Sequence, residues 1–401
     1  MLPNKQMIKK GYIVENTQKK VLRFFRVNMY LSILALMLSF KIFGYNLTGY
    51  LWLIILLYSI YTIFTNKKIH FPILIWIPFV LYLSIYLIID YSIIGLQAIL
   101  QYFCPIIVGI AVSGLTYDEN SLKKIISYFK RFAFFLIFYL IVVSYFRFGQ
   151  AGIGTGATTI LCTMVAVVIL ADFWITHKIT SLLLYALLVL IPFLSITRTG
   201  MAMILVILPI NFFRINLPTR FILLFITLII AITIFYSSSF QQKSFFSGSG
   251  QITDISLDNP NFYTGGRTTL YSLLDAGLEE NPIWGNGPRS ELILFQQQGL
   301  ELKESHNDYK AIRYGYGWVG LITLFLGFIG SFIYLFKLKS KLRNKYQRIF
   351  LTTALTLFIP LLGFMSTDNI LKYTIYYSTF HFAFMAICFA EYKNNTILKE
   401  L

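Results

Sequence analysis

Residues 93–115 read IIGLQAILQYFCPIIVGIAVSGL, and no charged side chain interrupts this segment. At 1.5 Å of rise per residue, a helix of this length spans about 34 Å, which is enough to cross the roughly 30 Å hydrocarbon core of a bilayer. Water-soluble proteins rarely keep so long a stretch free of charge. The segment therefore predicts a transmembrane helix.

Similar apolar runs recur along the whole chain. We predict twelve transmembrane helices, at residues 27–45, 47–65, 71–89, 93–115, 132–148, 157–176, 179–196, 199–213, 221–236, 314–336, 349–366 and 370–390. Apolar residues make up 57% of the sequence and charged residues only 13%, about half of the charged fraction in a typical soluble domain. So little charge cannot cover a water-facing surface, so the composition favours an all-α polytopic membrane protein.

Lysine and arginine are distributed unevenly between alternate loops. If both termini lie inside, 24 of the 34 basic residues fall in inner segments, and 11 of the 17 acidic residues fall in outer ones. The positive-inside rule then places both termini in the cytoplasm. The same bias accounts for the net charge of +17, so no nucleic-acid partner is expected.

The predicted topology divides the chain into five parts. They are a basic cytoplasmic segment (1–26), nine helices (27–236), a large outer loop (237–313), three helices (314–390) and a cytoplasmic tail (391–401). The chain contains no cytoplasmic domain that could hydrolyse ATP. The glycine run GQAGIGTG at 149–156 lacks GK[ST] and lies outside, so it is not interpreted as a nucleotide site.

The outer loop is the only long hydrophilic stretch. It opens with a Ser/Gly/Gln run at 237–250, which we predict to be flexible. An amphipathic helix is predicted at 268–280, because leucines recur on one face of it, and a second from about 301 to 314. The three cysteines, Cys104, Cys162 and Cys388, all fall in apolar runs, so neither a disulfide framework nor a cysteine metal site is expected.

Arg198 stands in Ser195-Ile-Thr-Arg198-Thr-Gly200, a tight turn between two apolar segments with no carboxylate nearby in sequence. An arginine at that depth costs roughly 3 kcal/mol on insertion scales, so it usually serves a function or finds a partner. The alternative is a side chain that extends to the lipid headgroups. For Lys41 and Lys372 that alternative is the favoured interpretation.

Two more outer arginines lie beside glycines. Gly265 and Gly266 precede Arg267 and the first loop helix. Glycines before a helix leave backbone N–H groups open to an anion, and a guanidinium adds a bidentate fork. Arg289 follows in a Gly/Pro turn and is a further candidate for binding the same anion. Each feature alone is also an ordinary loop feature.

His306 is the only histidine that the predicted topology places outside. A lone histidine makes a poor metal site, but imidazole is the usual general base near neutral pH. Asp308 and Glu304 are the candidates for orienting its ring. Aromatic residues beside it are also expected at a membrane interface. The neighbouring residues that we expect to contact the substrate are Asn307, Tyr309 and Trp318.

Three of these features together resemble the O-antigen ligase and O-antigen (Wzy-type) polymerase superfamily. They are the Arg198 turn between two central spans, the loop sequence GGRTTLYSLLDAGLEENPIWGNGP (265–288) and the sequence ESHNDYKAIRYGYGWVGL (304–321). Their order and spacing match the family, as does the expected number of spans. The resemblance covers residues 195–335, whereas the first half of the chain matches only as generic spans.

The resemblance implies a membrane glycosyltransferase of the GT-C type in the bacterial cytoplasmic (inner) membrane, with its active site on the extracytoplasmic face. It implies an oligosaccharide donor linked to undecaprenyl pyrophosphate, and neither a metal nor any other cofactor. Arg198 and Arg267 match the arginines that hold the pyrophosphate, and His306 matches the histidine proposed as base. Arg289 has no clear counterpart in the family.

The sequence leaves more than one activity open. A polymerase transfers the growing glycan onto a new lipid-linked repeat unit, whereas a ligase transfers finished glycan to a lipid A core or another acceptor. The richness in Ile, Lys, Phe, Asn and Tyr is typical of surface-polysaccharide clusters and favours the polymerase, with a chain-length regulator protein as a candidate partner. A transporter or flippase would also need many spans, but it has no need of an outer loop ending in a histidine.

Overall fold

The computed structural model describes residues 20–400 with short gaps at 37–40, 43–44, 67, 149–155, 196, 214–216, 257, 301–303 and 343. Within helices and strands, the side chains at 41–48, 143–148 and 393–400 are also outside the description. Residues 1–19 of the predicted N-terminal segment and nearly all of the glycine run at 149–156 therefore lie outside the described residues.

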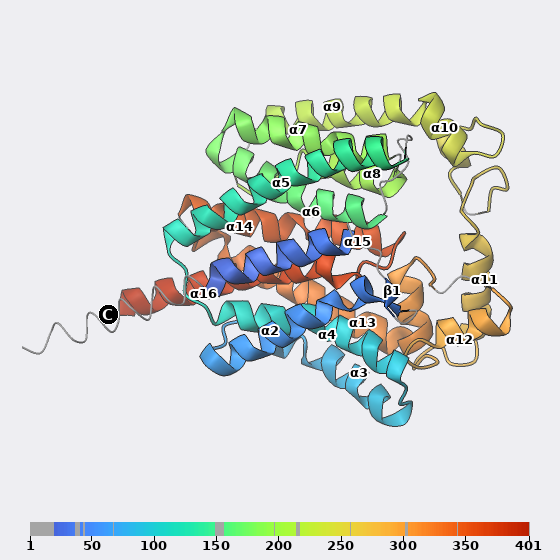
Figure 1. Cartoon of the computed structure of the whole chain (residues 1–401), viewed down its shortest axis with the longest axis horizontal. Coiled ribbons are helices and arrows are strands. Elements are labelled where there is room, and N and C mark those ends of the chain that lie inside the picture. The colour runs from blue at the N-terminus through green and yellow to red at the C-terminus, as the bar shows by residue number, and fades with distance from the viewer. Residues whose placement is uncertain are drawn as a thin grey trace, which may run out of the picture.

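The described chain is almost entirely helical (Figure 1). A first helix covers residues 20–36, and a short antiparallel pair follows, β1 (Lys41–Ile42) with β2 (Tyr45–Asn46). The helices before the predicted outer loop are α2 (Leu51–Asn66), α3 (Ile77–Ile89), α4 (Ile93–Ser113), α5 (Glu119–Phe148), α6 (Gly156–Thr176), α7 (Ile179–Leu194), α8 (Arg198–Val206) and α9 (Leu217–Phe235). The loop contains α10 (Ser238–Ser244), α11 (Arg267–Leu278) and α12 (Ser290–Gln297). The last helices are α13 (Asp308–Lys337), α14 (Lys345–Thr356), α15 (Phe358–Met365) and α16 (Ser378–Glu400).

The predicted all-α polytopic architecture is confirmed. Within the described residues, six segments are long and apolar enough to cross a membrane: Ile93–Ser113, Glu119–Val142, Gly156–Thr176, Leu217–Phe235, Asp308–Ser340 and Lys345–Met365. Each of the twelve predicted spans overlaps a helix, but how many of them cross stays a prediction. The eighth is the weakest, because α8 has nine residues and is only about 14 Å long.

The centre of the bundle is formed by α4, α6 and α16. Helix α4 packs against α2 and α16, and α6 packs against α5, α7 and α14. Helix α9 lies at the edge (Figure 1), where Phe221, Ile222 and Phe225 are exposed. A long exposed helix of this kind needs an apolar solvent, so its surface fits contact with lipid.

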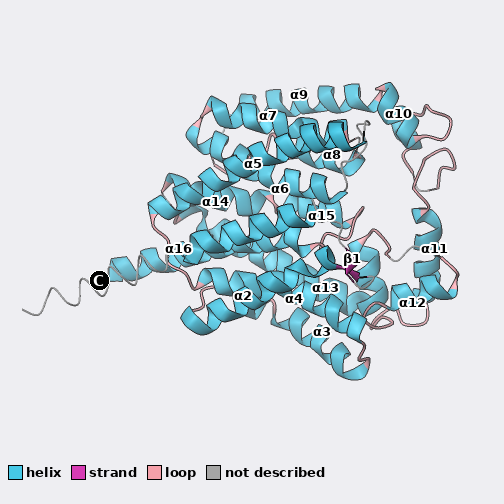
Figure 2. Ribbon diagram, in the orientation of Figure 1, coloured by secondary structure: helices cyan, strands magenta, loops and turns pink. Residues whose placement is uncertain are grey.

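The short helices of the loop gather at one end of the bundle. Figure 2 shows α10, α11 and α12 along that end, while the C-terminal end of α16 projects from the opposite one. Helix α11 confirms the helix predicted at 268–280. Its buried residues Leu270, Leu274 and Leu278 pack in one cluster with Phe295 and Tyr314.

The second predicted loop helix is wrong in its bounds. Residues 304–307 are not helical, and α13 begins only at Asp308. The cause is local, because the side chain of Asn307 accepts a hydrogen bond from the backbone N–H of Lys310 at 3.0 Å and so caps the helix there. The loop also contains two helices that the sequence did not predict, α10 and α12.

Helix α13 is interrupted where the outer loop crosses it. Gly317 has a φ of 61°, a left-handed conformation that glycine adopts without strain. Next to it, the N–H groups of Trp318 and Val319 donate to the carbonyl oxygens of Pro282 and Ile283 at 3.1 and 3.2 Å. A Cβ atom at Gly317 would lie 2.1 Å from the carbonyl oxygen of Ile283. Glycine therefore allows the loop to be fastened to the start of this helix.

Candidate functional site

Arg198 connects the turn between α7 and α8 to the outer loop. Its Nη1 donates a hydrogen bond to the carbonyl oxygen of Tyr263 at 3.0 Å. Its guanidinium also lies over the ring of Phe262, 5.1 Å from the centroid, a favourable cation–π distance. Both partners come shortly before the Gly265-Gly266-Arg267 sequence. The turn and the loop motif, which are far apart in sequence, therefore meet.

Arg267 begins α11 beside the same place. Gly265 and Gly266 have φ values of 65° and 78°, so both take the left-handed conformation that favours glycine. No side chain caps this end of α11, which leaves its first backbone N–H groups open to an anion. Burial, and after it the charge of Arg267, lowers the pKa of Arg198. The two predicted donor-binding arginines are therefore close enough to repel each other.

A third cation, which the sequence analysis did not predict, lies beside these two arginines. Lys243 lies on α10, and its Nζ donates to the carbonyl oxygen of Ser195 at 3.3 Å. Burial, and after it the charge of Arg198, lowers the pKa of Lys243. Among the described residues no carboxylate forms an ion pair with any of the three cations. We call Arg198, Lys243 and Arg267 the cation cluster.

The sequence analysis did not select this lysine, because it predicted a flexible run at 237–250. The structure has the helix α10 there instead. The buried side chain of Gln241 donates to the carbonyl oxygen of Phe235 at 2.8 Å and accepts from the N–H of Gly250 at 2.7 Å. The buried ring of Phe245 packs beside that of Phe235. These contacts fold the run back on itself and hold Lys243 beside Arg198.

His306 is paired with a carboxylate, but not with either one that the sequence suggested. Its Nδ1 lies 3.7 Å from Oδ1 of Asp368, and its side chain is 38% exposed. Asp308 instead accepts a hydrogen bond from the N–H of Leu371 at 2.9 Å. Glu304 accepts from the hydroxyl of Tyr373 at 2.8 Å. Asp368 is therefore the residue placed to orient the imidazole.

The first turn of α6 links the histidine to the cation cluster. A Cβ atom at Gly156 would lie 2.6 Å from Oδ2 of Asp368. The hydroxyl of Thr159 is 3.0 Å from that of Thr197, the residue before Arg198. Gly156 and Thr159 are one helical turn apart, roughly 5 Å along the axis. The first turn of α6 therefore lies beside Asp368, the neighbour of His306, and beside Thr197, the residue before Arg198.

The other predicted substrate contacts have structural partners. Asn307 caps α13, and its amide also donates to the carbonyl oxygen of Ser366 at 3.0 Å. The hydroxyl of Tyr309 donates to the carbonyl oxygen of Leu362 at 2.8 Å. Trp318 is exposed and carries the guanidinium of Arg313 4.4 Å from its ring centroid. Of these three, Trp318 has the most surface free for a substrate.

Arg289 belongs to a separate buried group of charges. Its Nη1 lies 3.6 Å from Glu291 and 4.0 Å from Glu304. Lys372 binds the same Glu291 at 2.9 Å, and the side chains of both are almost fully buried. We predicted that Lys372 extends to the lipid headgroups. This prediction is wrong, because the ion pair with Glu291 holds the lysine side chain in the protein interior. We call Arg289, Glu291, Glu304 and Lys372 the paired network.

The described residues contain no group of three or more His, Cys, Asp or Glu side chains that could hold a metal ion. The cation cluster instead offers two guanidinium groups and one ammonium group. Such groups bind phosphate oxygens directly and can neutralise charge on a leaving phosphate. Metal-independent chemistry stays a prediction.

Comparison with known families agrees with the motifs. Residues 182–325 match the family model described as O-antigen ligase. No curated protein matches the chain. The matched segment runs from α7 into α13 and contains the whole cation cluster and His306, whereas Asp368 lies beyond it. The central part of the chain is therefore similar to the O-antigen ligase family, and the resemblance to the O-antigen ligase and polymerase superfamily is confirmed.

Members of this family are glycosyltransferase-like enzymes. Together with the apolar helices, the match identifies the chain as a membrane protein with an O-antigen ligase or polymerase type of function. The match does not distinguish these two activities.

Proposed function

We propose that the protein is a polymerase of surface-polysaccharide repeat units, O-antigen or capsule. It would transfer glycan from undecaprenyl pyrophosphate to a sugar hydroxyl of another lipid-linked repeat unit, on the outer face of the cytoplasmic membrane. The observation that carries the proposal is the cation cluster, which has three positive charges and no ion-paired carboxylate among the described residues.

The cluster suits a pyrophosphate for electrostatic reasons. Cations held near one another without counter-ions repel, so an anion that lies between them relieves the repulsion. A guanidinium binds phosphate oxygens in a bidentate manner, and the open N-terminus of α11 adds backbone donors. The charge that develops on the pyrophosphate as its bond to the sugar breaks would be stabilised by the same groups.

His306 supplies the base in this proposal. The acceptor oxygen forms a bond to the anomeric carbon, the bond from that carbon to the pyrophosphate oxygen breaks, and the pyrophosphate leaves with the electron pair. The imidazole takes the proton of the acceptor hydroxyl. Asp368 orients the ring and stabilises the imidazolium that forms. Its 3.7 Å distance is typical of catalytic pairs that tighten when substrate binds.

The lipid-pyrophosphate bond supplies the energy, so the reaction needs no nucleotide. In this proposal it also needs no divalent metal. Activity that survives EDTA supports this part of the proposal, and loss of activity that Mg²⁺ or Mn²⁺ restores contradicts it.

A ligase is the second candidate, since the matching family model covers both activities. The two activities differ in the acceptor rather than in the donor site. Incubation of the purified protein with one synthetic undecaprenyl-pyrophosphate repeat unit tests them. A ladder of products supports the polymerase. Unchanged repeat unit, with transfer only when a lipid A core is added, supports the ligase and overturns the polymerase.

A further inference from the structure

A second polar cavity lies at the other end of the bundle from the cation cluster. It measures about 920 Å³, a volume that suits a small ligand or a lipid headgroup. Its walls come from the end of α6, the segment between α8 and α9, and the connection from α13 to α14. In Figure 1 this end is the one from which the C-terminus projects. The predicted topology makes it the cytoplasmic end.

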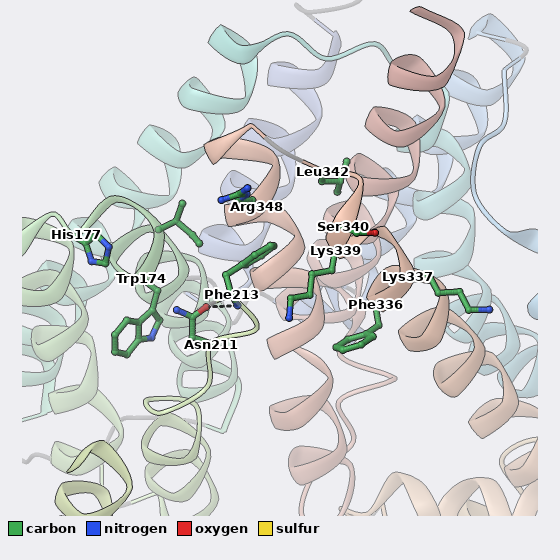
Figure 3. Close-up of a pocket in the computed structure, with 11 residues that line it drawn as sticks. Trp174, His177, Asn211, Phe213, Phe336, Lys337, Lys339, Ser340, Leu342 and Arg348 are labelled. Carbon is green, nitrogen blue, oxygen red and sulfur yellow. Dashed lines mark hydrogen bonds between the residues drawn. The ribbon is translucent and has the colours of Figure 1, made fainter. Parts of the chain in front are cut away.

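Two cations converge in this cavity on one aromatic ring. The Nζ of Lys339 lies 5.9 Å and the guanidinium of Arg348 5.5 Å from the centroid of Phe213. In the view of Figure 3, Lys339 lies between Phe213 and Phe336 and Arg348 lies on the other side of Phe213, whereas Lys337 points away. None of the described residues that line the cavity is an Asp or Glu. The described side chains that line the cavity therefore carry a net positive charge.

Part of the remaining wall is apolar. Phe336 and the ring of Trp174 line the cavity beside the cations. Tryptophan and basic residues together are typical of the level at which lipid headgroups lie. A water-soluble anion would gain nothing from the apolar walls, whereas the glycerol and upper acyl carbons of a phospholipid would cover them.

We propose that this cavity binds the phosphate group of an anionic phospholipid of the cytoplasmic leaflet. Lys339 and Arg348 hold the phosphate oxygens, and Phe336 and the ring of Trp174 cover the apolar part of the lipid. Basic cavities between transmembrane helices on the cytoplasmic side bind anionic headgroups in this way. The site is separate from the cation cluster, so the proposal does not depend on the glycosyltransferase assignment.

The test uses the full-length protein in detergent, titrated with phosphatidylglycerol or phosphatidylcholine and followed by native mass spectrometry and thermal unfolding. We expect phosphatidylglycerol to bind and to raise the unfolding temperature. Lys339→Gln and Arg348→Gln should each weaken its binding about tenfold. Trp174→Ala, which removes part of the apolar wall, should weaken it by a smaller factor.

Lys341→Gln is the matched control. This lysine belongs to the same connection and has the same charge, but it contacts the hydroxyl of Tyr392 and does not line the cavity. Equal weakening in the control, or unchanged binding in all three cavity variants, overturns the proposal. Inorganic phosphate at the same concentration should not stabilise the protein. If it protects as well as the lipid does, a free anion rather than a lipid occupies the site and the proposal fails.

Discussion

The end of the molecule at which α10, α11 and α12 lie holds two groups of charges, and the groups differ in their ion pairing. In the paired network, Arg289 and Lys372 face two carboxylates, and Lys372 and Glu291 are both buried. In the cation cluster, Arg198, Lys243 and Arg267 have no ion-pair partner among the described residues. Buried charges that neutralise each other hold a fold together, whereas positive charges gathered without a counter-ion indicate a site for an anion. The comparison favours a structural role for the paired network and is consistent with the proposed donor binding by the cation cluster.

Breaking the paired network should have the largest effect on stability. Lys372→Met leaves Glu291 buried with only the more distant Arg289, so we expect a loss of about 3 kcal/mol in the free energy of unfolding. The measurement is thermal or denaturant unfolding of the purified variant in detergent. The double variant Glu291→Met with Lys372→Met should recover most of the loss. Wild-type stability of Lys372→Met would contradict a structural role for the pair.

Breaking the cation cluster should weaken function and leave stability near that of the wild type. Arg198→Ala or Arg267→Ala removes charge-assisted hydrogen bonds to the pyrophosphate, worth about 1.5–3 kcal/mol each. We expect donor binding and turnover to fall together, by about tenfold to a hundredfold. Arg→Lys keeps the charge but not the planar fork and should rescue only part of the loss. An unfolding temperature that falls as it does in Lys372→Met would place these arginines with the paired network instead.

The sequence predicted the helices better than it predicted the site. The helix predicted at 157–176 is observed as Gly156–Thr176, because an apolar run in lipid has few alternatives to a helix. Glycines before Arg267 and the leucine pattern after it also have local causes, and α11 follows them. The site depends on contacts between distant segments, which no local pattern encodes.

Lys243 and Asp368 show why the sequence did not predict the rest of the site. Lys243 stands in a polar run whose composition resembles a linker, and only the buried Gln241 and Phe245 reveal that the run is folded. Asp368 follows α15, far along the chain from His306, with no motif around it. Arg289 was predicted as a site residue, although the structure shows that it is ion-paired. The sequence of its own turn does not reveal that pairing.

Lys243 offers a finer test of the cluster. It is exposed and acts as a point charge rather than as a fork, so Lys243→Gln should weaken donor binding by only about fivefold, close to 1 kcal/mol. Lys310→Gln is the matched control, because it removes the same charge from the outer loop but from a lysine paired with Asp275. Equal effects in the two variants would mean that general charge, not the cluster, attracts the donor.

The sidedness of both groups rests on topology, which a labelling experiment checks without any change in activity. Ser249 is exposed in the outer loop, so Ser249→Cys should react with an impermeant maleimide on intact cells or spheroplasts. The three native cysteines are buried and should contribute little background. Labelling that requires lysis would place the loop in the cytoplasm and remove the basis for an extracytoplasmic site.

The most direct test measures donor binding and elongation side by side for His306→Ala and Arg198→Ala. The undecaprenyl-pyrophosphate repeat unit serves as the ligand in both assays, with protein amounts matched. A general base contributes about 10²–10⁴-fold, so His306→Ala should lose elongation by that factor while it still binds donor. Arg198→Ala should lose both. Elongation at the wild-type rate by His306→Ala, or normal donor binding by Arg198→Ala, would contradict the assigned roles.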